Sequence, residues 1–146
     1  MGDVPERYRI LPHTADGKFQ AFGATLEEAF GNAALATASL QWDWSKVEPR
    51  TRYSVRVRGR DLEQLLVKFL GEVVFLFETR RFLLGEVASL TIEQGEADCR
   101  IEAVFIGDHL TDRHELFGAV KAVTYNEMKI EESDCGLYTV QVVVDM

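Results

Sequence analysis

The chain has 146 residues, of which 47% are hydrophobic, and 24 acidic against 16 basic residues give it a formal net charge of -8. This composition indicates a globular chain with a single domain over 1–146 and excludes a disordered one. Because an excess of carboxylates repels a phosphate backbone, we expect a protein or cation partner and no strong direct nucleic-acid binding.

The N-terminal ten residues are polar, and no apolar run approaches the ~20 residues that a membrane span needs. The two cysteines, Cys99 and Cys135, form no CxxC pair, so no thiolate zinc site is predicted. We therefore expect a cytoplasmic protein in a reducing compartment, without a membrane anchor.

The first half of the chain predicts two short strands over 8–11 and 18–23, followed by a helix over 25–40. Thr25 and Glu28 stand at the spacing of a capping box, which marks the start of this helix.

A third strand is predicted where apolar and polar residues alternate over 53–59. A second helix opens at Asp61, with Gln64 at the capping-box position, and its wide apolar stripe indicates a central core element.

The second half predicts strands. A hairpin is expected from 83–94 and 99–106, then a polar loop over 107–114, then a pair formed by 116–130 and 137–144. Together these elements predict an α+β fold in which two main helices pack on a mainly antiparallel β-sheet.

Two places carry residues that suit metal binding, and a lysine further along the chain could serve them as a counter-charge. His13 and Asp16 lie in a four-residue run after Pro12, where Asp16 fits either a hairpin turn or a hard oxygen ligand. Asp145 ends an apolar strand beside Met146 and fits either a solvated terminus or one half of a cation site.

Lys121 fits either an outward side chain on an alternating strand or a counter-charge for such carboxylates. Two carboxylates about 4 Å apart repel by roughly 4 kcal/mol at an effective dielectric of 20, so they need a cation or a lysine beside them, or one of them takes up a proton. Oxygen ligands favour Ca²⁺, Mg²⁺ or Mn²⁺ over zinc. Nothing in the sequence itself places Asp16 beside Asp145.

A second polar group, formed by Asp108, His109, Asp112 and His114, fits either a metal site or a solvated loop, and the loop is favoured because the spacing matches no zinc-helix motif. The chain also lacks the GxxxxGK[ST], GxGxxG, HExxH and GxSxG patterns. Nucleotide binding and common hydrolase chemistry therefore have no support in the sequence.

Several segments, in order along the chain, resemble the archease family. The HTAD run resembles its N-terminal motif, the helix after Gly59 its middle helix, the KAVTY run its late strand, and the final VVD its acidic ending. The segments that carry the resemblance are 13–16, 22–34, 59–70, 115–125 and 143–145.

The resemblance implies a protein cofactor of RtcB-type RNA ligases, and not an enzyme. Such ligases join 2',3'-cyclic-phosphate or 3'-phosphate ends to 5'-hydroxyl ends in tRNA splicing and RNA repair. An archease promotes GTP-dependent guanylylation of the ligase and allows multiple turnover.

The resemblance also implies site residues. The two aspartates of the family's metal site fall on Asp16 and Asp145, and its functional lysine falls on Lys121. We add His13 as a functional residue and Met146 as a ligand through its carboxylate or carbonyl. Ca²⁺ is the first expectation for the metal, with Mn²⁺ or Mg²⁺ as alternatives.

The sequence departs from the family pattern at Gly17, Lys18, Asp108 and Asn126, but keeps both aspartates and the lysine. Two other classes stay open. One is a metal-dependent phosphoester-processing enzyme that uses the same carboxylates. The other is a metal-free, chaperone-like module that binds a protein.

Overall fold

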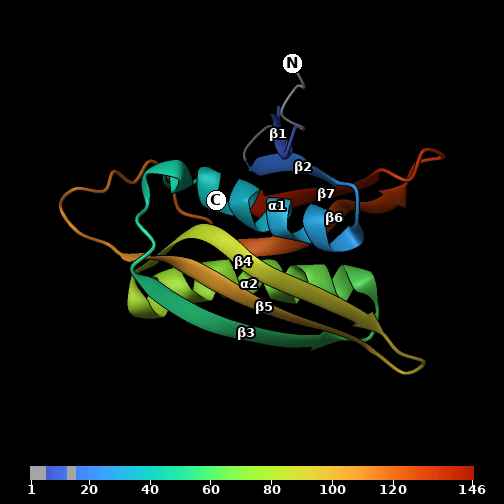
Figure 1. Cartoon of the computed structure of the whole chain (residues 1–146). Coiled ribbons are helices and arrows are strands. Elements are labelled where there is room, and N and C mark those ends of the chain that lie inside the picture. Colours follow the sequence, from blue (N-terminus) through green and yellow to red (C-terminus); the bar gives the residue numbers. More distant parts are fainter. Residues whose placement is uncertain (1–5, 13–15) are drawn as a thin grey trace, which may run out of the picture.

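The computed structural model describes residues 6–12 and 16–146. In these residues it contains two α-helices, a short 3-10 helix and strands whose arrangement Figure 1 shows. The helices are α1 (Leu26–Ser39), η1 (Trp44–Lys46) and α2 (Leu62–Arg80). The strands are β1 (Tyr8–Leu11), β2 (Gly17–Gly23), β3 (Thr51–Gly59), β4 (Phe82–Gln94), β5 (Cys99–His109), β6 (Ala122–Glu132) and β7 (Tyr138–Asp145).

The strands form two sheets. One has the order β1-β2-β7-β6 and the other β3-β5-β4, and every pairing is antiparallel. The predicted α+β class with two main helices on antiparallel strands is confirmed, although the strands divide between two sheets. In the first sheet the last strand, β7, lies between β2 from the start of the chain and β6.

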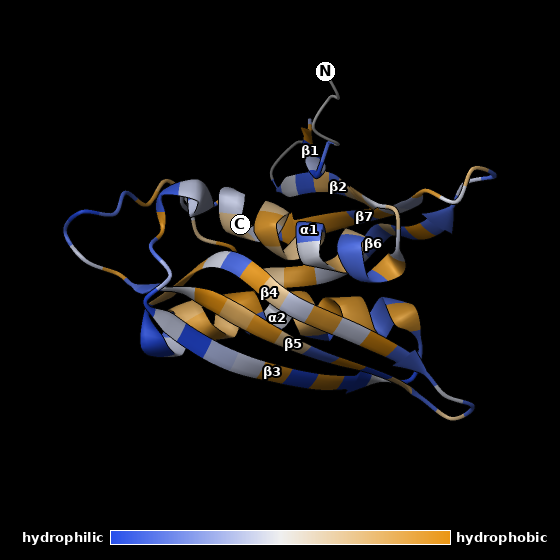
Figure 2. Cartoon of the chain, in the orientation of Figure 1, coloured by the Kyte–Doolittle hydropathy of each residue, from blue (hydrophilic) through white to orange (hydrophobic). Residues whose placement is uncertain are grey.

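Each helix contacts both sheets. α1 packs against β2 and β4, and α2 packs against β3 and β6. Phe69 on α2 lies between Phe30 on α1 and Phe105 on β5, with ring centroids 6.3 Å and 5.5 Å away. Figure 2 shows hydrophobic residues along β7 and α1, while β4 alternates in character. The core therefore joins the two sheets through the helices.

Both predicted helix starts are confirmed by their caps. The Thr25 hydroxyl accepts a hydrogen bond from the Glu28 amide at 3.0 Å, and the Asp61 carboxylate accepts one from the Gln64 amide at 2.8 Å. Each cap satisfies an amide that has no partner within its helix. These bonds join residues three apart, which is why the sequence reveals them.

The polar loop predicted over 107–114 is wrong for its first three residues, which belong to β5. Gly107 pairs with Leu84, and a Cβ at Gly107 would lie 1.9 Å from the carbonyl oxygen of Leu83. Only a glycine allows the backbone of β4 to come this close. β5 therefore continues through Asp108, which is buried.

The strand predicted from residue 116 begins only at Ala122. Ahead of it, the Phe117 amide donates to the carbonyl oxygen of Gln41, and the Val120 amide donates to the Gln41 side chain. Two backbone donors of this segment are therefore satisfied by Gln41, the residue that follows the C-cap of α1. A sequence pattern cannot show such a partner.

Candidate functional site

The first candidate feature is the end of the four-stranded sheet where β2 begins and β7 ends. Gly17 on β2 pairs with Val144 on β7. Continued by one residue, this antiparallel register sets Asp16 opposite Asp145. We call these two residues the acidic edge. The strand register thus brings together the backbone positions of two acidic residues from opposite ends of the chain.

β6 completes this end of the sheet from the other side of β7. Ala122 pairs with Asp145, and the backbone amide of Lys121 donates to the carbonyl oxygen of Asp145 at 2.7 Å. The Lys121 side chain is exposed. The backbones of three predicted site residues, Asp16, Asp145 and Lys121, therefore meet at one sheet end.

Strand alternation assigns the acidic edge to a face. Phe19 and Ala21 on β2 are fully buried and belong to the hydrophobic core. Positions of the other parity, among them Lys18, are only half-buried, so they lie on the outer face, away from α1. Asp16 and Asp145 share this parity, and Asp145 is exposed.

Met146 closes the sheet end on its core side. A Cβ at Gly17 would lie 2.9 Å from a methyl of Val144 and 3.1 Å from the Met146 sulfur, and one at Gly118 would lie 3.0 Å from the Met146 methyl. The Met146 side chain thus packs over two glycines, which explains why this chain has a glycine at position 17. The proposed ligand role of its terminal carboxylate stays a prediction.

His13, the remaining predicted site residue, lies outside the described residues. Its role beside Asp16 therefore stays a prediction.

The donor set of the acidic edge suits a hard divalent cation. Carboxylate oxygens are the ligands that Ca²⁺ and Mg²⁺ prefer, and Mg²⁺ is commonly held by one or two carboxylates together with water and substrate phosphates. Among residues 6–12 and 16–146, no three His, Cys, Asp or Glu side chains form a group that could hold an ion. Within the described residues, the acidic edge therefore supplies two acidic residues, Asp16 and Asp145, as candidate ligands.

Sequence analysis missed an ion pair close to this edge. The ammonium of Lys18 lies 3.0 Å from the carboxylate of Glu127, and the Lys18 side chain is only 18% exposed. The sequence hinted at this ion pair only by its departures from the family pattern: Lys18 forms the pair, and Asn126 precedes Glu127. The pairing itself depends on β6, whose path the sequence does not reveal.

The second polar group does not form a site. The Asp108 carboxylate lies 3.6 Å from the Arg50 guanidinium, whereas the Nδ1 atom of His114 accepts a hydrogen bond from the Thr111 amide at 2.9 Å. The His109 ring lies 3.3 Å from the Tyr53 hydroxyl. Asp108 and His109 are strand residues with their own partners, so the solvated-loop prediction is wrong for these two.

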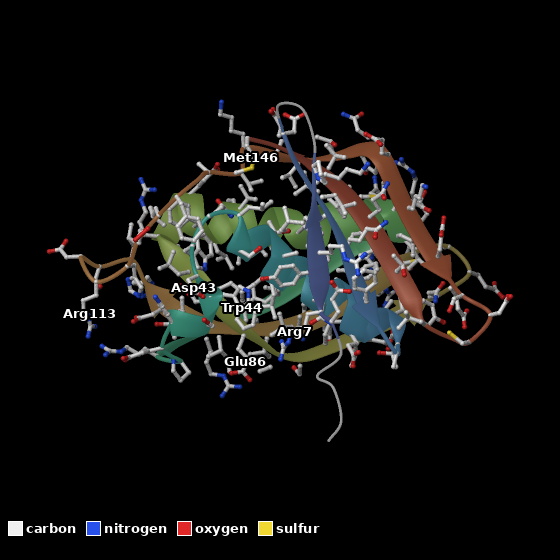
Figure 3. All side chains as sticks on the ribbon, turned by 90° about the horizontal axis from the view of Figure 1, so that it is seen from above. Arg7, Asp43, Trp44, Glu86, Arg113 and Met146 are labelled. Atoms are coloured by element: carbon white, nitrogen blue, oxygen red, sulfur yellow. The ribbon has the colours of Figure 1, made fainter. Side chains whose placement is uncertain are left out.

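An open groove of about 430 Å³ lies elsewhere, between η1 and the segment before β6. Trp44 in its wall donates from Nε1 to the Tyr8 hydroxyl at 2.9 Å, and Arg113 lines its other side. Figure 3 shows Met146 apart from Asp43, Trp44 and Arg113. The groove is therefore distinct from the acidic edge.

In the part of the chain that the structure describes, neither helix is long and apolar enough to cross a membrane.

Fold and site define a class of small α+β protein: two antiparallel sheets bridged by two helices, with a carboxylate from each end of the chain at one sheet end. The sequence profile described as "Archease protein family (MTH1598/TM1083)" matches residues 8–146. The chain belongs to the archease family.

Individual relatives agree with this assignment. The chain is 41% identical to the protein archease of Pyrobaculum neutrophilum over 144 residues, which cover 97% of each chain. It is 38% identical to that of Methanosarcina mazei over 147 residues, which cover all of both chains. The solution structure of Methanobacterium thermoautotrophicum protein 1598 matches with a TM-score of 0.82 and 30% identity, and the match covers 96% of this chain and 99% of that one.

Proposed function

We propose that this protein is a metal-binding cofactor that activates an RtcB-type RNA ligase in tRNA splicing or RNA repair. In this role it promotes GTP-dependent guanylylation of the ligase and allows multiple turnover, without being an enzyme itself. Family membership supports the proposal. The observation that carries it is the strand register, which continues from the Gly17–Val144 pair to set Asp16 opposite Asp145.

Asp16 and Asp145 are the proposed ligands of a divalent cation, Ca²⁺ in the first place and Mn²⁺ or Mg²⁺ as alternatives. Met146, through its carboxylate or carbonyl, completes the proposed ligands, and His13 is proposed as a functional residue beside them. The cation supplies positive charge for phosphate oxygens of GTP. Lys121, whose backbone is bonded to Asp145, supplies an exposed ammonium beside them.

The proposed partner is the ligase protein in the cytoplasm. The net charge of -8 favours docking on a basic protein surface and accelerates the encounter at low salt. The same charge disfavours independent binding of RNA.

The test is ligase turnover with and without this protein, at fixed GTP and Mn²⁺. We expect the wild-type chain to raise guanylylation and to allow many turnovers, and Asp16→Asn or Asp145→Asn to abolish both effects. Glu96→Gln is the control, because it removes one exposed carboxylate in the β4–β5 turn. Circular dichroism checks that each variant is folded.

Two results would contradict the proposal. Normal stimulation by either aspartate variant would show that the acidic edge is not the site. Hydrolysis of a 2',3'-cyclic phosphate by the isolated protein would instead favour a metal-dependent enzyme.

A further inference from the structure

β6 contains a wide β-bulge near the acidic edge. Thr124 pairs with Val143, but the next paired residue of β6 is Lys129, which lies opposite Gln141. The four residues between them therefore oppose a single residue of β7. Within this bulge Glu127 has a φ of 52°, in the left-handed region that a residue with a side chain rarely adopts.

Two glutamine side chains fix this bulge. Gln141 donates from Nε2 to the carbonyl oxygen of Glu127 at 2.7 Å, and Gln20 donates from Nε2 to the Gln141 side-chain oxygen at 3.0 Å. Gln141 is only 6% exposed. Loss of these bonds would leave a buried side-chain amide without a partner, which costs free energy. The bonds therefore stabilise the left-handed backbone conformation at Glu127.

The bulge brings the Glu127 carboxylate to Lys18. The two charged groups are 3.0 Å apart, with the Glu127 side chain 52% exposed. Lys18 pairs with Val143, which is buried although it lies outside the main hydrophobic core. The bulge, the glutamines and the ion pair thus form one connected structure on the outer face of the sheet.

Lys18, in β2, lies on the same face of the sheet as the acidic edge. It stands two residues from Asp16 along the strand, a spacing of about 7 Å, and is diagonal to Asp145 across the pair. A side-chain ammonium at that backbone spacing lowers the affinity of the edge for a divalent cation, unless its charge is compensated.

We propose that the Lys18–Glu127 ion pair sets the cation affinity of the acidic edge. Glu127 holds the ammonium on the outer face and offsets its charge, so that a divalent cation can bind beside it. This inference rests on the proposed function, because it assumes that Asp16 and Asp145 take a cation. The bond from the buried Gln141 amide explains why the chain retains a strained residue at position 127.

The test is isothermal titration of the metal-free protein with CaCl₂ and, separately, MnCl₂ at low ionic strength. We expect Glu127→Gln to weaken binding about fivefold, because it leaves the ammonium uncompensated. Lys18→Gln is expected to strengthen binding by a similar factor, and the double variant to return close to wild type.

Matched controls come from the second sheet, where Arg56 and Glu102 form a cross-strand ion pair at 3.2 Å. Figure 1 places β3 and β5, which carry this pair, far from β2 and β7. Glu102→Gln and Arg56→Gln change the net charge by the same amounts as the test variants. We expect them to alter the affinity less than about twofold, because both side chains are exposed on the other sheet, where water weakens the effect of their charges on the edge.

Glu127→Gly distinguishes an effect on cation affinity from a loss of stability. It removes the carboxylate but relieves the left-handed strain, so it should weaken cation binding while raising the unfolding temperature. Unchanged affinity in both Glu127 variants, or equal shifts in the Glu102 control, would overturn the inference and leave the proposed site standing. A wild-type chain that binds neither cation would overturn both.

Discussion

Lys121 donates its backbone amide to the carbonyl oxygen of Asp145 at 2.7 Å, which joins the start of β6 to the end of β7. Together with the Gly17–Val144 pairing, this bond builds the sheet end on the backbones of three strands. Sites supported by strands hold their side chains more firmly than sites on loops. The acidic edge thus lies where β2 begins and β7 ends.

Cation binding should stabilise the fold through Asp145. We expect CaCl₂ or MnCl₂ to raise the melting temperature of the wild-type chain, since a ligand at 100 times its Kd adds about 2.7 kcal/mol. Asp145→Asn should lose this shift, and EDTA should reverse it in the wild type. Differential scanning calorimetry measures the effect, and a full shift in Asp145→Asn would exclude this residue as a ligand.

Gly17→Ala should destabilise the protein by about 1–3 kcal/mol, since the added methyl overpacks the site. The new Cβ would lie 2.9 Å from methyl carbons of both Leu40 and Val144. Gly71→Ala is the matched control, because a Cβ there meets nothing within 4 Å inside α2. Urea unfolding should show that the control gains up to about 1 kcal/mol. Equal effects of the two substitutions would contradict the packing of Gly17.

Gln141→Leu should cost about 1–3 kcal/mol, because it leaves the carbonyl oxygen of Glu127 without the amide that binds it. Hydrogen exchange of the amides from 125 to 129 should accelerate as the bulge loosens. Gln94→Leu, at an exposed position in β4, is the control. Unchanged exchange in Gln141→Leu would show that the bulge does not depend on this side chain.

The two cysteines should differ in reactivity. A hydrogen bond from the Ser133 hydroxyl lowers the pKa of the exposed Cys135 thiol, whereas burial raises the pKa of Cys99. A lower pKa means more thiolate at a given pH, so iodoacetamide should alkylate Cys135 first. Ser133→Ala should shift its alkylation profile to higher pH. Mass spectrometry after timed quenching measures this, and faster alkylation of Cys99 would contradict it.

The sequence by itself determined the elements that depend on near neighbours. The caps at Thr25 and Asp61 join residues three positions apart, and the hairpin turn after β4 is closed by a bond from the Gly95 amide to the Asp98 carbonyl oxygen. Alternation and helical spacing also gave the α+β class. These features follow from local geometry, which a linear pattern encodes.

Only the tertiary structure decided which distant residues meet. It set Asp16 opposite Asp145 through strand register, and it tied the segment before β6 to Gln41 where a strand was expected. It also brought Glu127 to Lys18 through a bulge held by the side-chain amide of Gln141. Such contacts arise because one shared core fixes the positions of all the strands together. The local sequence of one strand does not specify which distant residues its side chains meet.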